Sequence, residues 1–236
     1  MKSIEELTKA QNDLIDEIQA FAESKKLVTE DICPIYDGVA DIDAYLKSSL
    51  KIMWILKNAY DANDGNNNPN GGGWYLKDVL DSSVQTWRGM AYAIYGFRND
   101  LDWGALPAIS QNKKIIDEIK SVAYININKM PGLKSISDSE ALYCYNLWKD
   151  ILNKQIDVYE PDVIIFGGTF RFFYNSDELE SSKQECFENL DSKADKKAIV
   201  YKYNGKWLIS VHHPSRYGGV YIDTLIDALN YVKNHK

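Results

Sequence analysis

Pro161-Asp-Val-Ile-Ile-Phe-Gly-Gly-Thr169 is an apolar run without polar alternation that ends in two glycines. Such a run is typical of a strand that is buried on both faces of a parallel sheet. The glycines and the threonine predict a tight turn into a helix. Because helical periodicity from Asp138 to about Val158 precedes the run, the segment indicates a helix followed by a buried strand, as in an α/β fold.

The same alternation extends through the rest of the chain. Strands are expected at about Lys51–Lys57, Ser121–Ile127, Asp162–Phe166 and Trp207–Val211. Ala198 to Val211 predicts a hairpin across Asn204-Gly205. Helical spacing is found in Ile4–Lys26, Asp41–Leu50, Trp74–Phe97, a segment from about Gln111, and Thr224–Asn234. The fold class predicted is α/β, a three-layer α/β/α arrangement with a central, mainly parallel four-stranded sheet.

Composition sets the broad class of protein. The 236 residues, 45% of them hydrophobic, predict one α/β domain over residues 1–236, with an amphipathic helical segment over about 1–50. No run is long enough to cross a bilayer and the N-terminus lacks the pattern of a secretory signal, so we expect a cytoplasmic protein without a membrane partner. Cys33, Cys144 and Cys186 are far apart, which argues against a zinc site, an iron–sulfur cluster or a disulfide framework. The net charge of −7 opposes broad nucleic-acid binding, so any DNA contact should be local.

Polar residues gather where the four expected strands end. The carboxyl ends of parallel strands form the ligand crevice of such sheets. The four loops there carry Lys57-Asn-Ala-Tyr-Asp61, Asn126 with Asn128, Gly167-Gly-Thr169, and His212-His-Pro-Ser-Arg216. Two of the three histidines lie in the last loop, where Pro214 stiffens the backbone that carries His213.

This ordered set of strand ends resembles the uracil-DNA glycosylase superfamily over roughly Lys51 to Gly219, with residue identity limited to three short motifs. The resemblance implies cleavage of the N-glycosidic bond of uracil or a related damaged base in DNA, without a metal or a cofactor. It implies that Asn58 orients the attacking water and that His213 donates to O2 of the departing base. Tyr60 would close the base pocket, and Asn126 or Asn128 would bond the base's amide edge.

The resemblance also implies contacts to DNA. Ser215 would bind a phosphate. After His-Pro-Ser the family often has Pro and an apolar wedge, whereas Arg216 and Tyr217 follow here, and Tyr217 could still act as a wedge beside the unstacked base. Gly168 is a candidate for close approach to a phosphate, although any α/β fold needs such a turn. Arg216 would form a small basic rim with four lysines: Lys57, Lys77, Lys129 and Lys134.

The chain departs from the family's most active branch, which has Asp where Asn58 stands. An amide orients water but cannot accept its proton, so slower activity is expected unless Asp61 or Asp64 supplies a carboxylate. An alternative is therefore a catalytically inactive relative that binds a nucleobase, nucleotide or protein partner. Each of these residues could also have a purely structural role. Asn58 could be a turn residue, Asn126 and Asn128 could cap the strand end, and His212 could be a structural residue.

Overall fold

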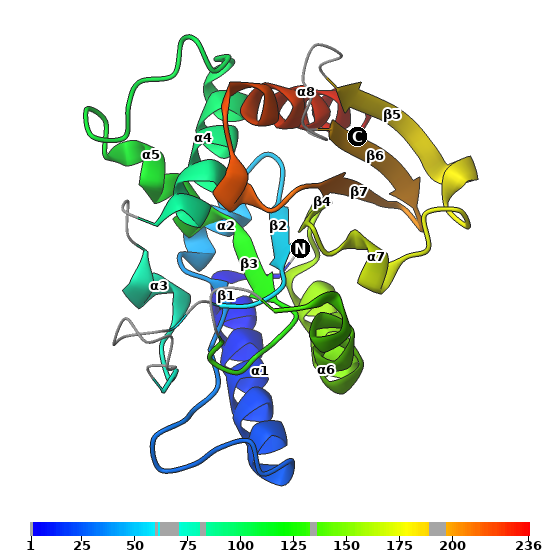
Figure 1. Cartoon of the computed structure of the whole chain (residues 1–236). Coiled ribbons are helices and arrows are strands. Elements are labelled where there is room, and N and C mark those ends of the chain that lie inside the picture. The colour runs from blue at the N-terminus through cyan, green and yellow to red at the C-terminus, as the bar shows by residue number, and fades with distance from the viewer. Residues whose placement is uncertain (1, 60, 62–70, 81–83, 133–135, 189–196) are drawn as a thin grey trace.

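The backbone forms one mixed sheet flanked by helices (Figure 1). The computed structural model describes residues 2–59, 61, 71–80, 84–132, 136–188 and 197–236. In these segments the strand order is β1-β3-β2-β4-β7-β6-β5. The strands are β1 (Gly38–Val39), β2 (Ile52–Leu56), β3 (Ala123–Asn126), β4 (Val163–Gly167), β5 (Lys183–Glu188), β6 (Lys197–Tyr203) and β7 (Lys206–Val211).

Four neighbouring strands of this sheet, β3, β2, β4 and β7, pair in parallel. Strand β6 returns antiparallel to β7 through a turn at Asn204 and Gly205, whose φ values are 49° and 76°. Positive φ at both positions is what a two-residue hairpin turn requires, so the expected hairpin is confirmed.

The α/β class is confirmed, whereas the expectation of four strands is wrong. Besides the hairpin strand β6, the sheet contains β1 and β5, each antiparallel to its neighbour. Sequence periodicity misses β1 because two residues are too few to show a period. It misses β5 because only Cys186 and Phe187 in that strand are apolar.

Helices cover both faces of the sheet. Side chains of α1 and α6 pack with one face, and side chains of α4 and α8 pack with the other. Figure 1 shows α1 and α6 side by side below the sheet and α8 above it. The helices are α1 (Ile4–Ser24), α2 (Ile42–Lys47), α3 (Leu76–Val79), α4 (Gln85–Asn99), α5 (Lys114–Asp117), α6 (Asp138–Tyr159), α7 (Phe170–Phe173) and α8 (Gly219–His235).

Local signals explain where the long helices begin. Helices α1 and α6 each start with a capping box, in which Ser3 pairs with Glu6 and Ser137 pairs with Glu140. The expected helix over Trp74–Phe97 is instead the short α3 and the longer α4, and the helix expected from Gln111 is reduced to α5 and a 3-10 turn. Helix α8 begins five residues earlier than expected, directly after the turn that follows β7.

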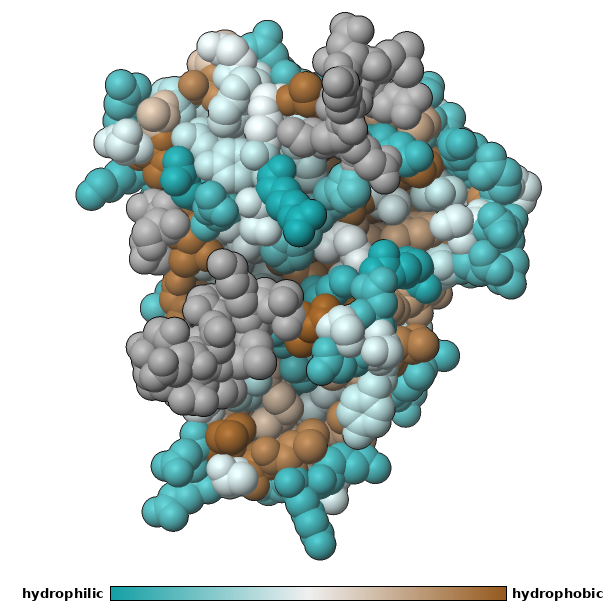
Figure 2. Space-filling view, in the orientation of Figure 1, coloured by the Kyte–Doolittle hydropathy of each residue, from teal (hydrophilic) through white to brown (hydrophobic). Residues whose placement is uncertain are grey.

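The surface in Figure 2 is largely hydrophilic, with an apolar patch at its lower end over the C-terminal half of α1. Of the described helices, none is both long enough and apolar enough to cross a bilayer.

Candidate functional site

The carboxyl edge of the parallel strands is where the expected site residues converge. Across the sheet, β3, β2, β4 and β7 are the second, first, third and fourth of the parallel strands along the chain, so the direction of the connections reverses between β2 and β4. Ligands of open α/β sheets bind in the crevice at such a reversal. Neighbouring strands are about 4.8 Å apart, so the turn after β2 lies about 10 Å from the turn after β7.

The backbone at this reversal is closely packed. The Thr169 hydroxyl donates to the Ile55 carbonyl at 2.7 Å, and the Gly168 amide donates to the Val211 carbonyl at 2.8 Å. Gly168 has a φ of 76° and is half-buried. It therefore ties β4 to β7 at the place where a ligand phosphate was expected to approach.

Asn58 and Asn128 meet at the ends of β2 and β3. Nδ2 of Asn128 donates to Oδ1 of Asn58 at 3.0 Å, and Oδ1 of Asn128 accepts from the Met130 amide at 3.1 Å. A Cβ atom on Gly132 would lie 2.0 Å from Oδ1 of Asn58, so a larger residue there would displace the Asn58 side chain. Both asparagines are half-buried, which leaves part of the pair open to a ligand.

Asn126 has a different environment from Asn128. Its side chain is fully buried, and its Oδ1 accepts from the Tyr124 hydroxyl at 3.0 Å. Its main-chain amide donates to Oδ2 of Asp37 at 2.6 Å. Within the described residues its buried Nδ2 has no hydrogen-bond partner. Asn126 therefore does not line an open surface, although it keeps two donors uncommitted.

The turn after β7 holds His213 in one tautomer. Nδ1 of His213 accepts from the Ser215 amide at 3.2 Å and lies 2.9 Å from the Ser215 hydroxyl. Burial, together with the nearby positive charges of Lys57 and Arg216, lowers the pKa of His213 to about 4. The imidazole is consequently neutral near pH 7. Because Nδ1 is the acceptor, the proton resides on Nε2, which can donate a hydrogen bond.

His212, Arg216 and Tyr217 complete this turn. The carbonyl of His212 accepts from the Tyr221 hydroxyl at 3.0 Å, while the His212 side chain is exposed. The Arg216 side chain is exposed as well. Tyr217 is half-buried against Tyr92 and Trp103, at ring-centroid distances of 5.8 and 6.1 Å. A wedge role for Tyr217 would require it to leave these rings.

Two further expected residues, Tyr60 and Asp64, lie outside the described residues. Asp61 is described, and both of its carboxylate oxygens are engaged. Oδ2 accepts from the Gly72 amide at 2.8 Å, and Oδ1 accepts from Nε1 of Trp74 at 3.2 Å. Asp61 thus holds the end of the glycine-rich loop in place, which makes it a poor replacement for a carboxylate beside Asn58.

The expected rim of basic residues is not formed by the lysines. Lys129 is fully buried, and its Nζ lies 2.8 Å from Oδ1 of Asp37. Nζ of Lys57 lies 2.8 Å from Oδ1 of Asp138, and Lys77 lines a cavity elsewhere. Lys134 lies outside the described residues. Arg216 remains as an exposed cation at this edge. The expectation that Lys129 contacts DNA is wrong, because its side chain is buried.

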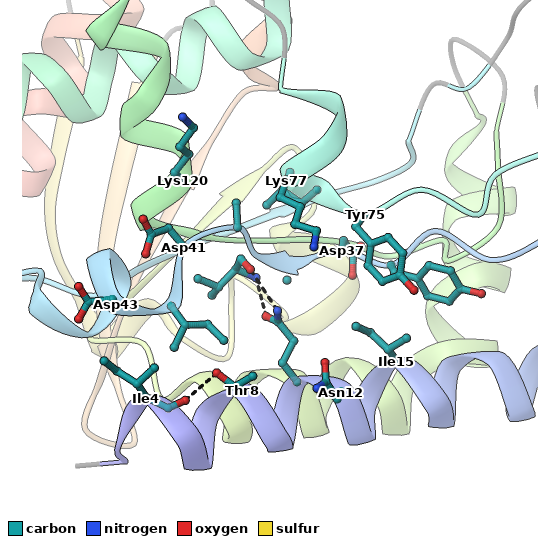
Figure 3. Close-up of a pocket in the computed structure, with 17 residues that line it drawn as sticks. Ile4, Thr8, Asn12, Ile15, Asp37, Asp41, Asp43, Tyr75, Lys77 and Lys120 are labelled. Atoms are coloured by element: carbon teal, nitrogen blue, oxygen red, sulfur yellow. Dashed lines mark hydrogen bonds between the residues drawn. The ribbon is translucent and has the colours of Figure 1, made fainter.

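Two cavities lie near these elements, and neither is lined by Asn58, Asn128 or His213. A cavity of about 570 Å³ lies between α1, β1, α2 and α3 and is lined by side chains such as Thr8, Asp41 and Lys77 (Figure 3). A smaller one of about 190 Å³ lies at the ends of β4 and β7 and is lined in part by Gly168 and His212. Small-molecule pockets usually measure about 300–1,000 Å³, so the smaller cavity has too little volume to enclose a whole ligand of that kind.

Sequence reasoning missed the first turns of α4 as part of this edge. The Trp87 ring lies 4.7 Å from the ring of Tyr124, the residue that holds Asn126. A Cβ atom on Gly89 would lie 2.3 Å from the Pro214 carbonyl oxygen. Helix α4 therefore connects the end of β3 to the turn after β7. No local signal in the sequence indicates this, since both contacts are long-range.

A comparison of the chain with family models and with curated proteins found no match.

Proposed function

We propose that this protein is a DNA glycosylase-like enzyme with a fold of the uracil-DNA glycosylase kind, which hydrolyses the N-glycosidic bond of uracil or a related damaged base. The main support is the state of His213, a neutral imidazole whose Nε2 carries the proton on a stiff turn at the carboxyl edge. The Asn58–Asn128 pair belongs to the same edge. A neutral donor can stabilise the departing base, and an amide can orient the attacking water, although it cannot accept the water's proton.

The reaction develops charge that these groups would stabilise. Breaking the bond leaves a cationic, oxocarbenium-like sugar and an anionic base. A preorganised donor beside developing negative charge is a large contribution to catalysis, and Nε2 of His213 would supply it at O2 of the base. Oδ1 of Asn58 accepts a hydrogen bond from Asn128, which fixes the orientation of the amide that would bind the attacking water. The proton that this water loses would pass to the anionic base or to solvent.

Base selection follows from the bonds of Asn126. Its Oδ1 is used by Tyr124, so only the Nδ2 donors remain for a ligand. A base that contacts Asn126 must therefore present an acceptor such as the O4 carbonyl of uracil, and the exocyclic amine of cytosine would be rejected. Because Asn126 is fully buried, the base must leave the stack and reach below the surface.

A second function, binding without cleavage, is favoured by one observation. Asn58 cannot accept the proton of the attacking water, and the nearby Asp61 is engaged by Gly72 and Trp74. A relative that binds a nucleobase, nucleotide or protein partner would need no such acceptor.

The deciding experiment incubates the protein with single- and double-stranded oligonucleotides that contain uracil, hypoxanthine or xanthine, followed by alkali to reveal abasic sites. We expect slow cleavage by the wild type, equal or faster cleavage by Asn58→Asp, and slower cleavage by Asn58→Ala. Asp at this position can still accept from Asn128 and also accepts a proton. If neither the wild type nor Asn58→Asp cleaves any of these substrates, the enzyme proposal is wrong.

A further inference from the structure

Arg88, in the first turn of α4, is a cation for which the described residues provide no hydrogen-bond partner at Nε. This Nε is buried. The residue as a whole is only half-buried, so part of it reaches the surface. Arg98 on the same helix differs, because its guanidinium bonds to Glu118, Ser121 and Ser48. A guanidinium carries five hydrogen-bond donors, and a buried donor that makes no hydrogen bond destabilises the folded protein.

The position of Arg88 places these donors beside the turn after β7. The adjacent Gly89 is in van der Waals range of the Pro214 carbonyl and of the Tyr217 ring, where any larger residue would clash. The positive charge of Arg88 also acts on the hydroxyl of Tyr217, whose pKa is raised by burial and lowered in part by that charge. Arg88 therefore lies on the helical side of the turn that carries His213.

The surroundings of this turn favour an anion. Arg216 is exposed on the turn itself and has no ion pair with any described residue. Val84, the N-cap of α4, makes no side-chain hydrogen bond to the first main-chain amides of the helix. Both features add positive potential on a chain whose net charge is −7.

We propose that Arg88 binds a backbone phosphate of the DNA strand whose base enters at the His213 turn, with Arg216 contacting the same strand from the exposed side. Guanidinium groups match phosphate oxygens in a bidentate geometry, which the part of Arg88 that reaches the surface could provide. The inference rests on the proposed DNA substrate but does not depend on catalysis. Arg88 is a binding residue here and takes no part in bond cleavage.

The test measures binding of an oligonucleotide that contains a tetrahydrofuran abasic site, at 50 to 200 mM salt, by fluorescence anisotropy. Arg88→Gln should weaken binding about tenfold at the lowest salt. It should also reduce the slope of log K against log salt by about 0.9, the value for one lost phosphate contact in duplex DNA. Thermal stability should not fall, because no partner of Arg88 is lost within the described protein.

Lys113→Gln is the matched control. Lys113 is exposed, and its neighbour Asn112 bonds to Tyr95 in the C-terminal half of α4. Replacing Lys113 therefore removes one charge away from the His213 turn. Equal affinity and equal slope for Arg88→Gln and Lys113→Gln would overturn the inference, as would a wild type that binds no DNA. The inference would also be overturned if Arg88→Gln lost binding of inorganic phosphate but bound DNA as tightly as the wild type. If Arg88→Gln weakens DNA binding while the wild type cleaves no base, the phosphate site stands and the enzyme proposal fails.

Discussion

At the scale of single residues, His213 shows how a turn selects one chemical state. The Ser215 amide donates to Nδ1, which leaves the proton on Nε2, and burial disfavours the charged form. The side chain is then a fixed neutral donor, suited to a base that becomes anionic as it departs. His212, one residue earlier, contributes its carbonyl to Tyr221 and has an exposed ring.

Replacing His213 by Ala should slow base cleavage by about a hundred- to a thousandfold, since a preorganised donor to developing charge is lost. Affinity for DNA should change by no more than about threefold. Single-turnover rates and anisotropy measure the two effects separately. His212→Ala is the control and should leave the rate nearly unchanged. Equal rates for His213→Ala and the wild type would show that this turn has no catalytic role.

The lowered pKa of His213 also predicts a pH dependence of stability. Free histidine titrates near 6.5 and His213 near 4, so between these values the unfolded chain binds a proton that the folded protein does not. The contribution of His213 to stability is therefore lost as pH falls from about 6.5 to 4. His213→Gln should lose less stability than the wild type between pH 7 and pH 4 in urea unfolding. Two curves that fall in parallel would argue against the shift.

At the scale of elements, a buried ion pair fixes the end of β3. Nζ of Lys129 lies 2.8 and 3.0 Å from the two carboxylate oxygens of Asp37, which also accepts from Gln155 and from the Asn126 amide. These bonds link the segment of β1 to α6 and to the strand end that carries Asn126. Burial lowers the pKa of Lys129, and the Asp37 carboxylate opposes that effect.

Removing one member of this pair should be strongly destabilising. Lys129→Met leaves the Asp37 carboxylate buried without its cation, which typically costs about 3–5 kcal/mol. Asp37→Asn combined with Lys129→Met should cost less than the sum of the two single changes. Urea unfolding of the four proteins measures the coupling. Additive effects would mean that the two side chains stabilise the protein independently.

At the scale of the whole molecule, net charge limits how strongly the protein could bind the proposed DNA substrate. The net charge is −7. Of the lysines expected at the carboxyl edge, Lys129 is buried with Asp37 and Lys57 is paired with Asp138. Few cations remain to release counterions from DNA. Binding should accordingly be weak, local and dependent on salt.

Arg216→Glu tests this view because Arg216 is exposed at the edge and makes no ion pair within the described chain. The change should weaken DNA binding at low salt and leave the melting temperature nearly unchanged. Lys113→Glu provides the same change of charge at a distance and should have a much smaller effect. An unchanged affinity for Arg216→Glu would place the DNA surface elsewhere.

The α/β class, the four parallel strands and the hairpin could be predicted from the sequence because their signals are local. Each core strand is a short apolar run such as Ile52–Leu56, and the hairpin turn needs the positive φ that Asn204 and Gly205 tolerate. The gathering of Asn58 and Asn128 at one edge also follows from topology, since parallel strands end on the same side.

Only the tertiary structure decided which of these side chains are available to a ligand. Lys129 was expected on the surface and is fully buried, because Asp37, from a segment 92 residues away in sequence, supplies its counter-charge. Oδ1 of Asn126 is occupied by the Tyr124 hydroxyl, and Arg88 is brought to the His213 turn by the packing of Gly89 on Pro214. Burial and pairing depend on contacts between distant segments, and a local pattern of residues carries no information about them.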